Sequence, residues 1–323
     1  MANEFTLADY ERTATPITAA VIRTWREASP ILEDLSFKTS DQLVEKIKRF
    51  NEIPEVPWRK VGATFTDLKV EPEDLEERLY FLGAKIDVPY EYVKANSLVD
   101  IRAAQEEAIM KGVAYKFNES FFLGSPAVDV DGLVGLHYRL INDFAAAQSI
   151  DAGALDISPD TAVASWQHKL FDVIDETLDV VEGNPADKVI FMGQKTYRRA
   201  QSAMRSSNLL DTTMDQLGRQ FITYGKGGPK IVEIGRKVDQ TTQIMPDTEL
   251  ANGTALTGST KSSLFVVRFG EPYVAGWCQE EPFGDDVGLL ENRTHYRTVV
   301  RGSAGLYINH PRSIGRAYNL QSA

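Results

Sequence analysis

The segment FFLGSPAVDVDGLVGLHY, residues 121–138, contains the feature that decides the fold. Two phenylalanines and a leucine end at Gly124, a polar turn with Pro126 follows, and Gly132 and Gly135 then enclose a second apolar run. Glycines spaced in this way serve either a loop that cradles a ligand or a backbone passage between two structural units. The flanking sequence has to decide between these two interpretations.

The residues before this segment predict a long helix and, ahead of it, a long β-hairpin. Ser97 is a suitable N-cap for a helix over 97–117, in which apolar residues recur at helical spacing. The stretches 41–62 and 78–93 read as extended strands around a polar, acidic middle over 63–78, which is expected to be a solvated turn or tip. An isolated two-stranded ribbon is marginal in water, so this hairpin is expected to lie on another surface.

The N-terminal region predicts an arm with one short helix. Residues 17–28 follow Pro16, carry a single apolar stripe at helical spacing and end before Pro30. The stripe has few neighbours in sequence to cover it. It packs either on the body of the chain or on another subunit.

The residues after the glycine segment predict a mixed α/β unit followed by β structure. Helices are expected over 160–182 and 196–207, with a short buried strand over 188–193 between them, and further strands follow. Residues 151–185 carry eight acidic side chains and the single base Lys169, so charge is segregated along the chain. Such segregation is useful if different surfaces meet different partners.

Composition excludes several classes of protein. The chain has 323 residues, 36.0 kDa and a formal net charge of −11, whereas general nucleic-acid binders are usually basic. Its single cysteine, Cys278, permits no intrachain disulfide and fits a reducing cytoplasm. No signal peptide and no membrane-spanning run is present in the sequence.

The sequence offers no catalytic, metal or cofactor motif. The histidines occur in no recognised metal-binding pattern, and His168 with Asp172 is best explained as a surface pair. The glycines of residues 225–228 favour a tight turn between strands over a phosphate loop, and Cys278 favours a packing role. We therefore expect no enzyme, no catalytic residue, no metal and no cofactor. An enzyme of unknown class that uses the middle α/β unit remains an alternative.

The order of these parts resembles the major capsid proteins of tailed bacteriophages, which have the HK-ninety-seven-type shell fold. The resemblance covers nearly the whole chain, and QLVEKIKRFNEIPEVPWRKVG, RLYFLGAKIDVPYEYV, the long helix and FFLGSPAVDVDGLVGL carry it. It implies an α+β fold with an N-terminal arm over 1–55, an extended β-hairpin loop over 56–92, a peripheral domain with the spine helix over 93–130 and 285–323, and an α/β axial domain over 131–284.

The resemblance also implies site residues, partners and a function. Gly124, Gly132 and Gly135 would form a structural hinge, and contacts between subunits would involve Trp25, Trp58, Arg59, Lys60, Glu71, Glu73, Asp74 and Glu76. The function implied is a structural subunit that self-assembles into hexamers and pentamers of an icosahedral phage head around double-stranded DNA, in a virion assembled in the host bacterial cytoplasm. The alternative is an encapsulin-type shell that encloses protein cargo. Further partners would be a portal protein, a separate scaffolding protein or none, decoration proteins and non-specifically bound DNA, with no membrane.

Some members of this family cross-link covalently through a lysine of the extended loop and an asparagine of a neighbour. Lys60, Lys69 and Lys85 lie in the corresponding region, as do Asn309 and Asn319 near the other end of the chain. No local motif supports this chemistry here, so we expect no cross-link.

Overall fold

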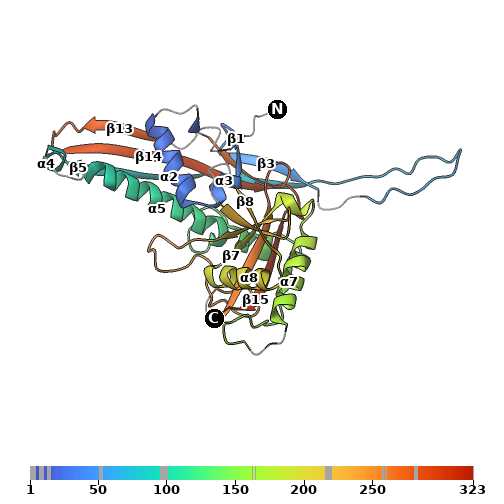
Figure 1. The fold of residues 1–323 in the computed structure, drawn as a ribbon. Coiled ribbons are helices and arrows are strands. Elements are labelled where there is room, and N and C mark those ends of the chain that lie inside the picture. Colours follow the sequence, from blue (N-terminus) through green and yellow to red (C-terminus); the bar gives the residue numbers. More distant parts are fainter. Residues whose placement is uncertain are drawn as a thin grey trace.

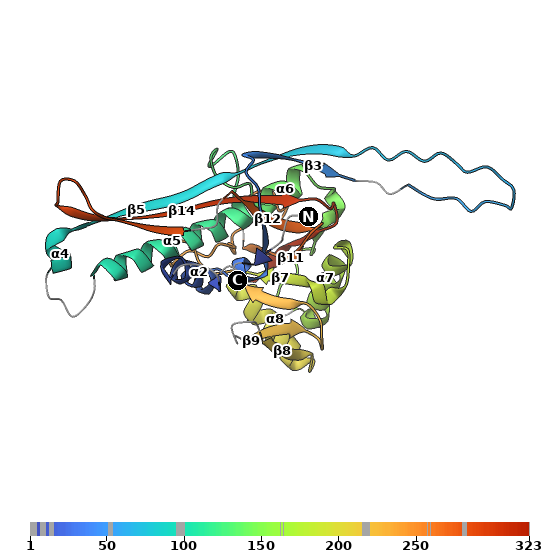
Figure 2. The ribbon, with the colours of Figure 1, turned by 90° about the horizontal axis from the view of Figure 1, so that it is seen from above.

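The computed structural model describes residues 5–6, 11–12, 16–50, 54–94, 101–161, 163, 165–214, 220–256, 258, 260–279 and 283–322. The chain forms an elongated upper layer of long strands and one long helix, with a compact α/β lobe below it (Figure 1). A narrow loop leaves one end of the upper layer and extends far beyond the body, as the view from above also shows (Figure 2). The fold is thus α+β, as the sequence predicts.

The upper layer is a mixed sheet centred on its longest strand, β14. The strand order is β1-β2-β12-β14-β13, and β5 pairs with the N-terminal part of β14, ahead of the residues that pair with β12. The pairing of β5 with β14 is antiparallel and runs from His295 opposite Pro89 to Ala304 opposite Tyr80. The strand bounds are β1 Phe5–Thr6, β2 Ser36–Thr39, β5 Tyr80–Pro89, β12 Val274–Cys278, β13 Phe283–Leu289 and β14 His295–Ile308.

The long helix α5, Ile101–Leu123, packs along β5. Its 23 residues correspond to a rod of about 35 Å. Met110, Ala114, Phe117 and Phe121 recur every three or four residues and are buried, so one face of the helix lies on the body. The helix expected over 97–117 is confirmed for its described part and continues further, while its expected cap, Ser97, lies outside the described residues.

The N-terminal helix is confirmed as α2, Pro16–Ala28. It packs against α5, and the short helix α3, Ile31–Asp34, follows it. The described part of the arm therefore lies on the body of its own chain. A further short helix, α4 (Tyr90–Lys94), follows β5.

The lobe is a seven-stranded mixed sheet whose outer face carries two helices. The strand order is β6-β15-β11-β7-β10-β9-β8. The helices expected over 160–182 and 196–207 are confirmed with shorter or shifted bounds as α7, Trp166–Val180, and α8, Gln194–Ser206. The strand bounds are β6 Ser149–Asp151, β7 Lys188–Met192, β8 Leu210–Met214, β9 Gln220–Tyr224, β10 Lys230–Glu233, β11 Lys261–Arg268 and β15 Ile314–Gln321.

Two hydrophobic cores lie on opposite faces of this sheet. Along β7, Val189 and Phe191 face the core shared with α5, whereas Ile190 and Met192 face the core shared with α7 and α8. Successive side chains of a strand point to opposite faces, so a strand covered on both sides is apolar throughout. This explains why KVIFM is a continuous buried run.

The C-terminal strands divide between the two sheets, which corrects the expectation for 285–323. β13 and β14 belong to the upper layer, but β15 pairs with β11 and β6 in the lobe. Conversely, β12 lies within the stretch expected to be wholly axial, yet it pairs with β14. β15 is buried along most of its length on both faces, and a central position in the lobe sheet supplies that burial.

Candidate inter-subunit surface

The loop over residues 54–72 projects from the body without helix or strand (Figure 1). Trp58 and Val61 are fully exposed, and further apolar side chains along the loop are exposed as well: Val56, Phe65, Leu68 and Val70. Monomeric proteins rarely expose so many contiguous apolar side chains unless they bind a partner. This loop is therefore the strongest candidate contact surface of the described chain.

The predicted contact residues Trp58, Arg59 and Lys60 all lie near the tip of the loop. The Arg59 guanidinium lies over the Phe65 ring at 4.1 Å and donates a hydrogen bond of 2.9 Å to the Ala63 carbonyl. The carbonyl of Lys60 accepts from the Ala63 amide at 3.1 Å, which closes a turn at Gly62. These local contacts hold the tip together and leave the Trp58 ring open to solvent.

Most of the acidic run over 71–78 is a strand at the base of the loop, which corrects the expectation of a solvated turn or tip. β4 (Glu73–Arg78) pairs antiparallel with β3 (Val44–Arg49). The register sets three acids opposite bases: Glu73 opposite Arg49, Asp74 opposite Lys48 and Glu76 opposite Lys46. Glu77 stands opposite Glu45, and each of these two acids pairs with a base elsewhere, Arg139 and Lys38 respectively. Opposite charges on facing residues of two paired strands stabilise the pairing. This explains why β3 is rich in bases and β4 in acids.

Of the predicted acidic contacts, three have partners within the chain. Glu71 pairs with Lys69, Glu76 with Lys46 at 3.2 Å, and Glu73 with Arg49 at 2.9 Å. All three carboxylates are still largely exposed. A role for them in contacts between subunits stays a prediction.

Two buried arginines fix the base of the loop to the body. Arg139, in α6 (Leu136–Asn142), donates two hydrogen bonds to the Glu77 carboxylate in β4, one of them 2.7 Å long, and another of 3.1 Å to the Val134 carbonyl. Arg49, in β3, donates to the Asp143 carbonyl at 3.3 Å. Both strands of the hairpin are thereby tied to one short segment of the chain.

This anchor was not predicted from the sequence, although the sequence contains a signal for it. Arg139 is the one base in the short helix LHYRLIN, whose other side chains are mostly apolar. An arginine inside an apolar run is seldom buried without a carboxylate partner, because a buried charge has to be compensated. Glu77, however, could not have been singled out among its acidic neighbours.

Trp25 was predicted to contact another subunit, and the structure contradicts this. Its ring is buried within the chain, among residues of α3, β2 and α5. Around Trp25, the apolar stripe of α2 is therefore covered by the chain itself. Likewise Asn319 is buried and donates a hydrogen bond of 2.7 Å to Asp151, so it is not available for a cross-link.

The glycines of the opening segment are required by close backbone contact. The Gly135 amide donates to the Gly124 carbonyl at 3.0 Å, so the two glycines lie against each other where the chain passes from α5 to α6. A Cβ on Gly124 would come within 1.9 Å of the Leu133 carbonyl, and one on Gly135 within 2.6 Å of the Gly124 amide. At Gly132 the nearest atoms belong to the Asp129 side chain. The segment is a packed passage rather than a ligand cradle.

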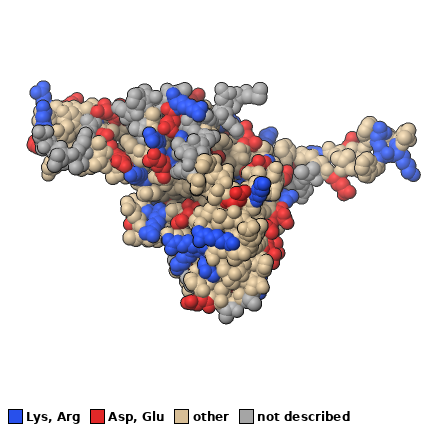
Figure 3. Space-filling view, viewed as in Figure 1, with Lys and Arg blue, Asp and Glu red and all other residues tan. Residues whose placement is uncertain are grey.

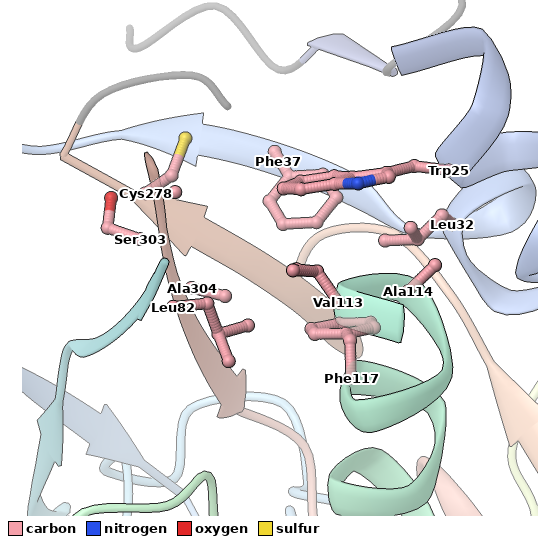
Figure 4. A pocket seen from close by; sticks show the side chains of 11 residues that line it. Trp25, Leu32, Phe37, Leu82, Val113, Ala114, Phe117, Cys278, Ser303 and Ala304 are labelled. Atoms are coloured by element: carbon pink, nitrogen blue, oxygen red, sulfur yellow. The ribbon is translucent and has the colours of Figure 1, made fainter. Parts of the chain in front are cut away.

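An apolar cavity of about 30 Å³ lies between α2, α5 and the upper sheet (Figure 4). Trp25, Phe37, Val113 and Phe117 line it, and Cys278 is the one titratable side chain at its wall. Ligand pockets usually measure about 300–1,000 Å³, so this cavity is far too small for a substrate. Cys278 is buried there as a packing residue, as expected.

Across the described ranges, the side chains form no group of three or more His, Cys, Asp or Glu that could hold a metal ion. The stretch 225–228 is a turn between β9 and β10, as expected, closed by a hydrogen bond from the Gly228 amide to the Gly225 carbonyl. No helix in the described part of the chain is long and apolar enough to cross a membrane.

By sequence, no family model and no curated protein matches the chain. Its structure, however, matches solved structures along most of its length. An encapsulin complex of Synechococcus elongatus matches with a TM-score of 0.58 at 14% identity, over 98% of this chain and 96% of that one. The chain has the HK-ninety-seven-type capsid fold.

Further structures with the HK-ninety-seven-type fold agree with this assignment. The capsid of a native GTA particle matches with a TM-score of 0.57 at 13% identity and covers 90% of this chain and 89% of that one. A structure of Microbacterium phage Oxtober96 matches with a TM-score of 0.54 at 14% identity, over 90% of both chains. These matches cover 90–98% of this chain, while the identities are too low to carry individual residues across.

Proposed function

We propose that this chain is the major capsid protein of a tailed bacteriophage, a structural subunit that assembles into hexamers and pentamers of an icosahedral head around double-stranded DNA. The observation that carries the proposal is the projecting loop over 54–72 with its exposed apolar side chains. This loop has no core of its own and would be stabilised by lying on a neighbouring copy. The matches to an encapsulin complex and to a capsid support a shell-forming subunit, which is the part common to both candidates below.

The geometry favours a ring of identical subunits over a two-fold dimer. The narrow loop projects from one end of the molecule, whereas paired strands and the helix α4 form the opposite end (Figure 2). A loop that covers the body of the next copy makes a heterologous contact, and such contacts close into rings when the rotation fits. Obligate interfaces of about 2,000–5,000 Å² then supply the burial that the loop lacks alone.

The role proposed is structural and not catalytic. The apolar cavity between α2, α5 and the upper sheet measures about 30 Å³ and has no room for a substrate. Two open hollows of about 330 and 360 Å³ lie beside α7 and α5, but among the described residues neither is lined by a Ser, Thr, Cys or His side chain that could act as a nucleophile or a general base. Portal protein, decoration proteins and a scaffolding protein are proposed partners of such a subunit. The proposed location is the phage head.

An encapsulin-type shell that encloses protein cargo is the second candidate. The encapsulin match over nearly the full length of both chains favours it. The two candidates share the fold and differ in what the shell contains.

The contents of natural particles distinguish the two candidates. Particles captured from the source organism with an antibody to the chain would be treated with nuclease, disrupted and analysed for DNA and for protein. Nuclease-protected double-stranded DNA of defined length is the expected result. A stoichiometric protein cargo without protected DNA would replace the phage assignment with the encapsulin assignment.

A further inference from the structure

The outer face of the lobe carries two helices of opposite charge. α7 and α8 pack over the same core on the sheet, with α7 against β6 and β15 and α8 against β8 and β10. Acidic side chains gather along the α7 flank and basic ones over α8 (Figure 3). The lobe therefore presents one acidic flank and one basic flank.

The exposed face of α7 has a surplus of acid that its own helix does not offset. Asp172, Asp175, Glu176 and Asp179 are all exposed, with Lys169 as the one base in the helix. These carboxylates stand three or four residues apart, a spacing at which like charges destabilise a helix. Glu176 and Asp179 also lie towards the negative C-terminal end of the helix dipole, where acids are unfavourable. These four carboxylates therefore do not stabilise α7.

The exposed face of α8 is the basic counterpart. Lys195, Arg198 and Arg205 are exposed at helical spacing, and the helix QKTYRRAQSAMRS contains no acid. Lys195 stands in the first turn, where the helix dipole disfavours a base. It pairs with Asp247 at 3.1 Å.

The central charges of both faces have no ion-pair partner among the residues that the structure describes. Asp172, Glu176, Arg198 and Arg205 make no salt bridge there, whereas Arg199 is engaged with the Ile157 carbonyl and the Trp166 ring. Although α7 and α8 are neighbours, these four charges are not paired across them, so each face is left to be neutralised by the opposite face of another copy.

We propose that the acidic face of α7 packs against the basic face of α8 of the next subunit around a closed ring. This inference rests on the proposed capsomer ring. A heterologous ring needs two different complementary patches on every subunit, and the two flanks of the lobe provide them. Complementary charge also fixes which flank meets which, because like charges brought together cost several kcal/mol.

A second copy fits these faces better than DNA does. Phosphate would be attracted to α8, but the neighbouring α7 repels it with four carboxylates. A copy of this chain offers the opposite arrangement, with a base-rich helix for α7 and an acid-rich helix for α8. DNA is therefore one of the outcomes that the test distinguishes.

The test uses charge reversal in the full chain. One variant carries D172K and E176K, a second carries R198E and R205E, and a third carries all four changes and keeps the wild-type net charge. Each is purified as the expressed chain, checked by urea unfolding, and assayed for rings by native mass spectrometry and negative-stain microscopy. Nucleic acid retained by the particles is measured in parallel.

The expected result is that each two-residue variant folds but loses rings by roughly tenfold or more, since like charges then face each other. The four-residue variant regains rings. An equimolar mixture of the two-residue variants forms rings of six, in which they alternate, but not rings of five, which cannot alternate. Wild-type rings weaken as salt rises from about 0.1 M to about 1 M, as screening shortens from about 10 Å to about 3 Å.

Three results would overturn the pairing. Folded two-residue variants that form rings like the wild type would show that these faces do not meet. So would a folded four-residue variant that forms no rings. Normal rings with reduced nucleic acid in the R198E, R205E variant would assign α8 to DNA instead. The wild-type chain is also co-expressed with the products of the neighbouring genes. If it forms no ring even then, both the proposed function and the proposed pairing of α7 with α8 are wrong.

Discussion

At the scale of single residues, the close contact between Gly124 and Gly135 determines how the chain turns between α5 and α6. The glycine pattern indicated a turn or close packing, and the structure shows that close packing is the reason. Which backbone atoms would meet a side chain was not readable from sequence, because the partners lie across a turn. The same limit hid the carboxylate that Arg139 binds.

Gly135→Ala is expected to destabilise the subunit. The new methyl group would come within 2.6 Å of the Gly124 amide and of the Ser120 carbonyl, and both are backbone atoms that cannot simply rotate away. Overpacking of this kind typically costs about 1–3 kcal/mol. Urea unfolding measures the loss.

Gly112→Ala is the matched control, since Gly112 lies inside α5 and its Cβ would meet nothing within 4 Å. Alanine should there stabilise the helix by about 0.5–1 kcal/mol. If both variants were equally stable, the close contact at Gly135 would not be a constraint.

His137 is expected to make the subunit less stable in mild acid. Burial, and next the positive charge of Arg316, lower the pKa of His137 to about 4 from 6.5. Between these values the unfolded chain binds a proton that the folded chain does not, so stability falls as pH falls. At about 1.4 kcal/mol per pKa unit, the loss between pH 7.5 and pH 5 is about 2 kcal/mol.

Urea unfolding at several pH values should show a flatter pH dependence for His137→Gln than for the wild type. Identical slopes for wild type and His137→Gln would show that His137 does not carry this dependence.

At the scale of elements, the extended loop was predictable as a projection but not in its pairing. The alternation in VEKIKR indicated a strand, whereas EDLEER was interpreted as solvated because a run of charge usually is. Its strand character came from a partner of opposite charge across the ladder. The stretch 80–89 was correctly predicted as a strand, yet its partner β14 lies more than 200 residues away, beyond what local pattern can show.

Arg139→Met is expected to loosen the base of this loop. Glu77 would be left without its bidentate partner in a largely buried position, and breaking a buried ion pair from one side typically costs about 3–5 kcal/mol. A double-mutant cycle with Glu77→Leu measures the coupling free energy between the two side chains. The double variant should lose less stability than the sum of the two single losses.

The exposed pair of Lys46 and Glu76 on the same hairpin is the control for this cycle. Its coupling should be within about 1 kcal/mol, because solvent screens exposed pairs. A buried pair no stronger than this exposed one would contradict the anchor at Arg139.

At the scale of the whole molecule, the order of parts was the most informative property of the sequence. Arm, hairpin, long helix, glycine passage and α/β unit were each weak as single signals, but together they predicted a fold that the structural matches support. What could not be predicted is the exchange of strands between the two sheets, in which β12 and β15 each join the sheet opposite to the one expected. Such exchange depends on long-range pairing that local periodicity does not encode.

The central claim is that the subunit is completed by its neighbours through the loop over 54–72. Electron cryo-microscopy of the expressed chain, alone and with the genes that flank its own, tests this most directly beside the variant Trp58→Ser, Phe65→Ser. We predict closed shells in which each loop lies on an adjacent subunit, and a variant that folds with wild-type stability yet does not close shells. A wild-type chain that stays a monomer of 36.0 kDa in both cases, or shells whose loops face solvent and tolerate both serines, would contradict it.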